Sequence, residues 1–361
     1  MTKGWVYNFP LYHLVCKMAD FFTVDEGMES LLPKLKERVE NGYHIAVFPE
    51  GSRSPDDHVK RFHKGSFLLA EQMELDIVLV YIFGTGRFLR KGSFWGESND
   101  VFIKVGERIT FDDPRFTGNY AERTKKIFRY YREQFEAFKA ECQTTRYHRR
   151  QLIENYIYKG PVVEYYTRVK TKMEDYYSVF DKIIPKKAKI VDLGCGYGYL
   201  DLMLTYRSAE REIIGVDYDE EKIALAANIP DNSDRLNFKQ GDISSFEFEP
   251  ADVYIFSDVL HYLKPEEQWE ALDNALANLN AGGTLIVRDG DTDLQERQKG
   301  TWLTEFFSTN IGFNKTRNEL HFLSGKALES WAAKNGLSVE RIDLTKKTSN
   351  IIFVFKRKEK A

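Results

Sequence analysis

The sequence predicts an α/β protein. Its larger part is a mainly parallel sheet closed by an antiparallel hairpin, preceded by a helical connector and a smaller α/β domain. From about residue 185 onward, short apolar runs alternate with helical periodicities, as in a parallel sheet with helices on both faces. Two late apolar runs are close enough in sequence to pair directly. Between Asn119 and residue 187, apolar residues recur at helical spacing instead.

Length and composition limit the functional classes. The 361 residues suffice for two domains, and a hydrophobic share of 42% supports hydrophobic cores. No run approaches the ~20 apolar residues of a membrane-spanning helix, and the opening residues lack a secretory signal, so we expect a cytoplasmic protein. A net charge of −3 gives no electrostatic case for a nucleic-acid partner. Three scattered cysteines predict reduced thiols and no metal site.

The first 140 residues contain a stretch suited to phosphate binding. A helix is predicted over Glu29 to Glu40 and a strand over Tyr43 to Phe48, which runs into Pro49-Glu50-Gly51-Ser52-Arg53-Ser54. A carboxylate, a glycine turn, two hydroxyls and an arginine in one loop can hold a phosphate ester, because Arg53 can make a bidentate charge-assisted contact. By composition alone, a strand-to-turn exit with an exposed arginine explains these residues equally well.

The segment Phe48 to Ser54 resembles the phosphate-binding block of the glycerolphosphate acyltransferase family, which includes the lysophosphatidate acyltransferases. Two downstream segments, Arg61 to Phe67 and the predicted strand Asp76 to Val80, resemble the same family. The resemblance covers roughly residues 5 to 110. It implies a phosphate-binding role for Glu50, Gly51, Ser52 and Arg53.

The chain departs from this family at two points. The family's acyl-transferring histidine, followed five residues later by an aspartate, has no counterpart before Glu50, since neither His13 nor His44 has that spacing. Leu79 and Phe83 stand where the family often has proline and histidine. Without the histidine base, we expect no acyltransferase activity and a vestigial anion site. We also expect the chain to begin inside the acyltransferase domain, with an acyltransferase or exporter segment upstream.

Residues 83 to 96 mix cations with large aromatics, which suits the headgroup boundary of an anionic membrane. A solvated loop whose aromatics fold back on the core is the slightly favoured interpretation, and peripheral contact with the inner face of the membrane is the alternative. A long helix from Asn119 carries an apolar stripe, interpreted as an interdomain or core face. The predicted parts are an acyltransferase-like domain (1–140), a helical connector (141–184) and a second domain (185–361). The loop contains Arg87, Phe88, Arg90, Lys91, Phe94 and Trp95, and the stripe contains Phe128, Tyr131, Phe135 and Phe138.

Ile190 to Leu200 predicts a strand, a glycine turn and a helix. Glycine stands at every second position from Gly194 to Gly198, which allows backbone to approach a ligand, and the helix that follows presents free N–H groups there. Asp217 ends the next predicted strand, near the interval of about 20 residues at which an acid meets ribose hydroxyls. The turn alone leaves nucleotide, flavin and methyl donor open.

The alternation of strands and helices continues to the end of the chain. Taken together, the series resembles the class I S-adenosylmethionine-dependent methyltransferases, with a Rossmann-like sheet. A dehydrogenase is the main rival, but the glycine spacing differs from G-x-G-x-x-G and the closing hairpin favours the methyltransferase. Strands are predicted at Leu236 to Phe238, Ala251 to Phe256, Leu337 to Leu344 and Asn350 to Phe355, with a helix starting at Pro265. The segment Ala281 to Val287 is predicted to provide a turn into a further strand.

The resemblance implies S-adenosyl-L-methionine as the cofactor. The turn from Asp192 to Gly198 would embrace its methionine portion, Asp217 the ribose, and Asp242 with Ile243 the adenine. Acidic groups accept from hydroxyls or an exocyclic amine, and Ile243 with Tyr218 can sandwich the ring. The predicted cofactor-binding residues are Asp192, Gly194, Cys195, Gly196, Gly198, Asp217, Tyr218, Asp242, Ile243 and Ser257.

Methyl transfer is largely a matter of alignment, because the sulfonium of the donor is already activated. A hydroxyl acceptor is helped by a base, and the ordinary pKa of histidine makes His261 the best candidate. A histidine in such an apolar helix start is also commonly a hydrogen-bonded structural residue. The other candidates are Asp258, Asp289 and Asp291, with His321 and Trp302 as weaker ones.

We therefore expect a methyltransferase that acts on a small lipid-like or aryl/polyene acceptor. The arrangement resembles bacterial fusions of an acyltransferase with a methyltransferase, so the acceptor class is inferred from the neighbouring domain and not from the site. One alternative is a non-catalytic module that binds S-adenosylmethionine and docks to a membrane or partner. A residual phospholipid acyltransferase is another.

Overall fold

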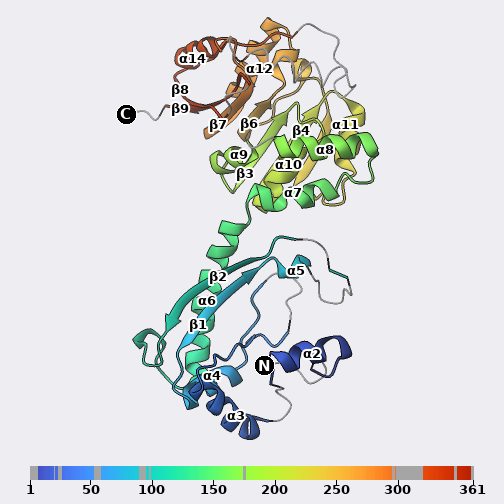
Figure 1. The fold of residues 1–361 in the computed structure, drawn as a ribbon. Helices are drawn as coiled ribbons and strands as arrows, with labels where there is room; N and C mark the ends of the chain where they lie inside the picture. Colours follow the sequence, from blue (N-terminus) through green and yellow to red (C-terminus); the bar gives the residue numbers. More distant parts are fainter. Residues whose placement is uncertain are drawn as a thin grey trace. The chain divides into compact units, whose positions relative to one another are not determined.

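The computed structural model describes residues 7–19, 21–22, 27–52, 58–88, 95–96, 99–173, 176–294, 297, 320–344 and 348–358. The chain divides into two compact units, Met1–Cys142 and Gln143–Ala361 (Figure 1). Within these described ranges, every helix is too short or too polar to cross a bilayer.

The first unit combines helices with a two-stranded antiparallel sheet (Figure 1). The helix predicted over Glu29 to Glu40 and the strand predicted near Asp76 to Val80 are both confirmed. The elements are α2 (Pro10–Met18), α3 (Met28–Glu40), α4 (Gly65–Gln72), β1 (Ile77–Phe83), α5 (Thr85–Phe88), β2 (Phe102–Ile109), η2 (Pro114–Phe116) and α6 (Tyr120–Cys142).

The strand predicted over Tyr43 to Phe48 is wrong. Among the described residues of the first unit, only β1 and β2 pair in a sheet, and they pair with each other. Tyr43 is 52% exposed and Phe48 is 76% exposed, whereas Ile45 is partly buried against the cluster of Leu31, Leu35 and Leu69. Strand propensity needs a partner strand as well as a core to pack against, and this segment has no partner strand among the described residues.

The apolar stripe of α6 packs into the core of the first unit. Phe135 and Phe138 are buried, and the Phe135 ring lies against that of Phe83, with 6.5 Å between centroids. Tyr131 packs on Tyr81 at 4.8 Å and donates its hydroxyl to the carbonyl oxygen of Val80 at 3.0 Å. The interpretation of this stripe as a core face is confirmed.

The second unit opens with three helices, α7 (Thr145–Glu154), α8 (Pro161–Met173) and α9 (Tyr177–Ile183). Gly160 adopts a φ of 106°, a backbone conformation that glycine reaches without strain, and Pro161 begins α8. The helical character predicted for this part of the chain is therefore confirmed.

A seven-stranded sheet forms the centre of the second unit, in the order β5-β4-β3-β6-β7-β9-β8 (Figure 1). All neighbours are parallel except β9, which is antiparallel to both β7 and β8. This confirms the predicted Rossmann-like sheet with its closing hairpin. The strands are β3 (Ala188–Leu193), β4 (Arg211–Asp217), β5 (Leu236–Gln240), β6 (Ala251–Ser257), β7 (Leu279–Gly290), β8 (Leu337–Ile342) and β9 (Asn350–Arg357).

Helices cover both faces of this sheet. Alternate residues of β3 enter different cores: Ile190 lies in one cluster, and Val191 and Leu193 lie in the other. The first cluster includes side chains of α7, α9, α10 and α11, and the second includes those of α12 and α14. The further helical elements are α10 (Tyr199–Arg207), α11 (Glu220–Ala227), η3 (Ile243–Ser245), η4 (Leu260–Tyr262), α12 (Pro265–Ala277) and α14 (Gly325–Lys334).

Candidate functional site

The glycine turn lies where the strand order reverses. Because β3 lies between β4 and β6, the connections that leave β3 and β6 run toward opposite faces of the sheet. In open α/β sheets, ligands bind beyond the carboxyl ends of the strands at such a reversal. Here the two loops touch, since a Cβ on Gly194 would lie 2.3 Å from Cγ2 of Val259, which follows β6.

The three glycines of the turn are required for different physical reasons. Gly194, Gly196 and Gly198 all adopt positive φ, at 83°, 59° and 72°. A Cβ on Gly198 would meet the Phe238 ring at 2.3 Å, so this position, like Gly194, is also required by packing inside the protein. Nothing lies within 4 Å of a Cβ built on Gly196. The backbone at Gly196 therefore faces open space that a ligand can approach.

Asp217 ties the turn to the end of β4. Its Oδ2 accepts the N–H of Gly196 at 2.8 Å, and its Oδ1 accepts the N–H of Asp219 at 2.9 Å. Two further main-chain N–H groups of the turn donate to the carbonyl oxygen of Val216, at 2.7 and 3.0 Å. Each carboxylate oxygen has a second lone pair, so Asp217 can also accept from a ligand hydroxyl.

Two buried acids, Asp192 of β3 and Asp201 of α10, lie next to the turn. They are 2% and 0% exposed. Within the described residues, Oδ1 of Asp192 and both carboxyl oxygens of Asp201 accept no hydrogen bond. Burial, followed by the charge of Asp192, raises the pKa of Asp201 well above its ordinary value. Burial also raises the pKa of Asp192, to about 7, with a smaller contribution from the charge of Asp217 and an opposing one from a hydrogen bond with Asp201. Burial, strengthened by the neighbouring charge of Asp192, therefore favours the neutral form of Asp201.

Cys195 is an uncharged part of the turn. Burial, and then the charges of Asp201 and Asp217, raise the pKa of its thiol well above the ordinary value. A thiol held in this state is a poor nucleophile. Its position in the turn therefore supports a packing role and no covalent one.

Ser257, the last residue of β6, presents a second unpartnered acceptor. Its hydroxyl oxygen is buried and has no hydrogen-bond partner among the described residues. A buried hydroxyl left unpaired costs about 1–3 kcal/mol, so such groups are normally satisfied by protein, water or ligand. The carboxyl edge beside the turn thus offers unused polar atoms to a ligand rich in hydrogen-bond donors.

The residues predicted to hold adenine lie beyond β4 and β5, which are neighbours in the sheet. Tyr218 follows β4 and is 47% exposed, and Ile243 follows β5 and is 7% exposed. Asp242 caps η3, because its Oδ1 accepts the backbone N–H and the hydroxyl of Ser244, at 3.0 and 2.9 Å. This capping role explains Asp242 without any ligand, and it engages only Oδ1.

The structure brings together two predicted catalytic residues that lie 28 positions apart. Nδ1 of His261, in η4, lies 2.6 Å from Oδ1 of Asp289, in β7, and the His261 backbone N–H donates to Oδ2 at 3.2 Å. The imidazole stacks on the ring of Phe322, with 4.8 Å between centroids, and is 1% exposed. The carboxylate fixes the orientation and tautomer of the ring. The same contacts also hold the η4 turn against β7.

The other predicted bases are engaged elsewhere. Asp258 adopts a φ of 55° and forms an ion pair with Arg288. Asp291 is 1% exposed, pairs with Arg341 at 2.7 Å and accepts the N–H of Gly325 at 2.8 Å, so it joins the end of β7 to α14. Both carboxylates therefore have structural contacts that explain their presence without a catalytic role.

The weaker candidate His321 donates its backbone N–H to the carbonyl oxygen of His261 at 2.8 Å. It also lines a cavity of about 550 Å³ together with Phe322 and Gly290, next to the His261–Asp289 pair. Trp302 lies outside the described residues.

Sequence reasoning missed Asp201 and the contribution of α8. Tyr166 of α8 packs on Tyr197 of the turn at 6.0 Å, and the hydroxyls of Thr167 and Tyr199 lie 2.7 Å apart. An acid in a first helical turn normally complements the helix dipole at the surface. In the sequence, the burial of Asp201 is indicated by the apolar residues on both sides of it, from Tyr199 to Leu204.

In the first unit, Glu50, Gly51 and Ser52 form a loop that contacts residues farther along the chain. Oε2 of Glu50 accepts the N–H of Lys60 at 2.7 Å, and the Lys60 ammonium donates to the Ser52 hydroxyl at 3.2 Å. Burial raises the pKa of Glu50. Gly51 has a φ of 65°, and a Cβ there would lie 2.9 Å from the His63 ring. Arg53 lies outside the described residues, as do Arg90, Lys91 and Phe94 of the predicted membrane loop.

Each of the two parts of the chain matches a known protein family. Residues 184–336 match the family model of a methyltransferase domain, and residues 1–83 match that of the acyltransferases. Carboxy-S-adenosyl-L-methionine synthase from Campylobacter lari is 27% identical over 134 residues, which cover 36% of this chain and 57% of that protein. The synthase from Chromohalobacter salexigens is 29% identical over 125 residues, covering 33% and 45%. The chain thus spans about half the length of these curated relatives.

An uncharacterized methyltransferase from Staphylococcus carnosus is 24% identical over 171 residues, covering 45% of this chain and 79% of that protein. Similar solved structures include the pyocyanin biosynthetic protein PhzM, with a TM-score of 0.44, 15% identity, and coverage of 57% of this chain and 62% of that chain. Magnesium protoporphyrin IX methyltransferase from Synechocystis, with bound SAH, has a TM-score of 0.41, 18% identity, and coverage of 60% and 96%. The chain therefore contains a domain of the methyltransferase family, for which S-adenosyl-L-methionine is the cofactor, and a region of the acyltransferase family.

Proposed function

We propose that the second unit binds S-adenosyl-L-methionine beyond the ends of β3, β4 and β6 and transfers its methyl group to a small acceptor. The observation that carries this proposal is the glycine turn held by Asp217 at the reversal of strand order. The open space at Gly196 and the unpartnered Ser257 hydroxyl lie at the same sheet edge.

The chemistry of this edge fits the cofactor. When bound, S-adenosylmethionine supplies an activated methyl group. Its ammonium, ribose hydroxyls and adenine amine are donors, and the edge offers acceptors on Asp192, Ser257, Asp217 and Asp242. The carboxylate of Asp217 also complements a cationic ligand. We assign Asp217 to the ribose, Asp242 and Ile243 to the adenine, and the turn to the methionine portion.

For a hydroxyl acceptor, we assign the role of general base to His261. With Nδ1–H donated to Asp289, Nε2 is the nitrogen that can take a proton. Asp289 then stabilises the imidazolium by its negative charge, as a carboxylate beside a catalytic histidine does. Asp258 is the weaker candidate because Arg288 already neutralises its charge.

The acceptor that we propose is lipid-like or an aryl/polyene compound, and its support comes from the acyltransferase-family region on the same chain. Because no histidine with the required aspartate spacing precedes Glu50, we propose that this region transfers no acyl group in this chain.

Methyl transfer from a labelled donor tests the proposed function. The full chain is incubated with methyl-labelled S-adenosylmethionine and with lipid, phenol or polyene extracts, and label is sought in the organic products. We expect incorporation into one acceptor class and its loss in Asp217→Ala. Binding of S-adenosylhomocysteine without transfer to any extract would instead favour the non-catalytic module.

A further inference from the structure

The outward face of α8 is apolar and basic. Val162 is 58% exposed, Tyr165 is 69% exposed and Val169 is 36% exposed. They recur three and four residues apart, so they form one stripe, which normally faces a core. In α8 the opposite face is the packed one, because Tyr166 and Thr167 contact the glycine turn and the start of α10. The exposed positions are Pro161, Val162, Tyr165, Arg168, Val169 and Lys172, which we call the α8 face.

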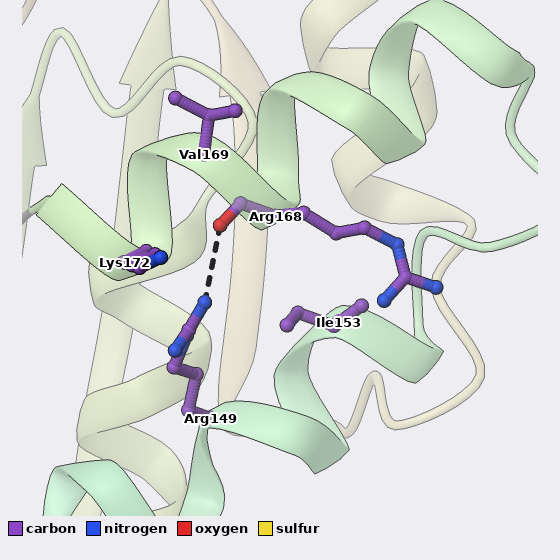
Figure 2. A pocket seen from close by; sticks show the side chains of 5 residues that line it. All are labelled: Arg149, Ile153, Arg168, Val169 and Lys172. Atoms are coloured by element: carbon purple, nitrogen blue, oxygen red, sulfur yellow. Dashed lines mark hydrogen bonds between the residues drawn. The ribbon is translucent and has the colours of Figure 1, made fainter.

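A cationic cavity adjoins the α8 face. It has a volume of about 630 Å³ and is lined by Arg149, Ile153, Arg168, Val169 and Lys172 (Figure 2). Figure 2 shows Arg149 reaching from α7 to α8, where it donates to the carbonyl oxygen of Arg168 at 3.2 Å. Glu164 pairs with Arg168 at 2.7 Å and offsets one of the three positive charges. The lining thus combines two aliphatic side chains with three cationic ones, has a net positive charge and contains no acidic side chain.

We propose that the α8 face and its cavity dock on a bilayer that contains anionic phospholipid. Arg149, Arg168 and Lys172 receive lipid phosphates, and Val162 with Tyr165 enters the headgroup boundary. Lysine and arginine lay their aliphatic stems on apolar surface while their charged heads reach phosphate. Tyrosine suits this boundary because it is apolar at one end and polar at the other.

Charge favours a bilayer over a second copy of the chain. Two-fold packing of the α8 face on itself would bring Arg168 and Lys172 of both copies together, and like charges repel. An anionic leaflet presents the opposite charge over an extended area, and each lysine or arginine near it strengthens attachment about fivefold. Because α8 packs on Tyr197, docking would hold the glycine turn near the membrane surface.

Sedimentation with vesicles tests this proposal. The full chain is mixed with vesicles of phosphatidylcholine alone or with phosphatidylglycerol added. We expect binding to the anionic vesicles that weakens with salt, and little binding to phosphatidylcholine alone. Arg168→Gln with Lys172→Gln should lower the partition coefficient about 25-fold, and Val162→Ser with Tyr165→Ser should lower it as well.

The matched control is Lys334→Gln with Lys356→Gln, which removes the same charge from exposed positions of α14 and β9. We expect it to bind like the parent, and all variants to keep the parent's affinity for S-adenosylhomocysteine, which shows that they fold. An equal loss in the control, equal binding to both vesicle types, or no binding would overturn the proposal. So would a dimer in solution that the α8 variants disperse.

Discussion

Removing the Ser257 hydroxyl is expected to stabilise the ligand-free protein and to weaken its binding of S-adenosylhomocysteine. The hydroxyl is buried at the end of β6 and has no partner among the described residues. An unpaired buried hydroxyl costs about 1–3 kcal/mol, so Ser257→Ala should raise the free energy of unfolding by about 1 kcal/mol. Loss of the hydrogen bond between the Ser257 hydroxyl and the ligand costs about 1 kcal/mol of binding free energy, which corresponds to about fivefold weaker binding.

Thermal unfolding and calorimetric titration of the same samples measure the two effects. About 1 kcal/mol corresponds to a rise of about 2–4 °C in Tm for a unit of this size. Thr205→Ser is a suitable comparison, because its hydroxyl already donates to the carbonyl oxygen of Leu202 at 2.8 Å and the serine can keep that bond. If Ser257→Ala lowers Tm and leaves the affinity unchanged, the hydroxyl is structural and the assignment to the cofactor is wrong.

Further predictions concern the acid pair, the histidine and the first unit. In the folded protein the pKa of Asp192 is raised to about 7 and that of Asp201 lies well above its ordinary value, so the unfolded chain loses these protons first as pH rises. This contribution to stability is fully present below about pH 4 and is lost as pH rises toward the folded-state pKa values, by up to about 1.4 kcal/mol per pH unit for each proton. Asp201→Asn should flatten this decline in chemical denaturation, and an unchanged slope would contradict the raised pKa of Asp201. The variant His261→Gln can keep a hydrogen bond to Asp289 but cannot act as a base. We expect its kcat to fall about a hundredfold or more, with loss of the acid limb of the pH–rate profile. A lower Tm with an unchanged pH–rate profile would mean that His261 has a structural role. Given an acyl thioester and lysophosphatidate, the chain should form no phosphatidate; turnover that Arg53→Ala abolishes would refute the predicted inactivity.

The fold of the second unit followed from local patterns. The strands β3 and β6 are short, mostly apolar runs between helical periodicities, and both faces of β3 are buried, so its sequence is apolar almost throughout. The segment Tyr43 to Phe48 is also rich in apolar residues but has no partner strand among the described residues, and partner strands are not visible in a local pattern. Local periodicity therefore identifies a strand only when the rest of the fold supplies its neighbours.

The site was predictable in its residue types and less so in its contacts. His261 and Asp289 meet because β6 and β7 run parallel in a register that pairs Ser257 with Arg288. The same register places Arg288 beside Asp258, so this candidate base forms an ion pair. Asp201 resembles an ordinary first-turn acid in sequence, and only the packing of α10 against the sheet shows that it is buried.

Binding of S-adenosylhomocysteine to the full chain tests the central claim most directly. Titration calorimetry compares the parent with Asp217→Ala and with Asp234→Ala, which removes an exposed acid of the same unit. The account predicts one site per chain, strongly weakened binding in Asp217→Ala, and parental affinity in Asp234→Ala. No binding to the parent, or equal affinity in Asp217→Ala, would contradict it.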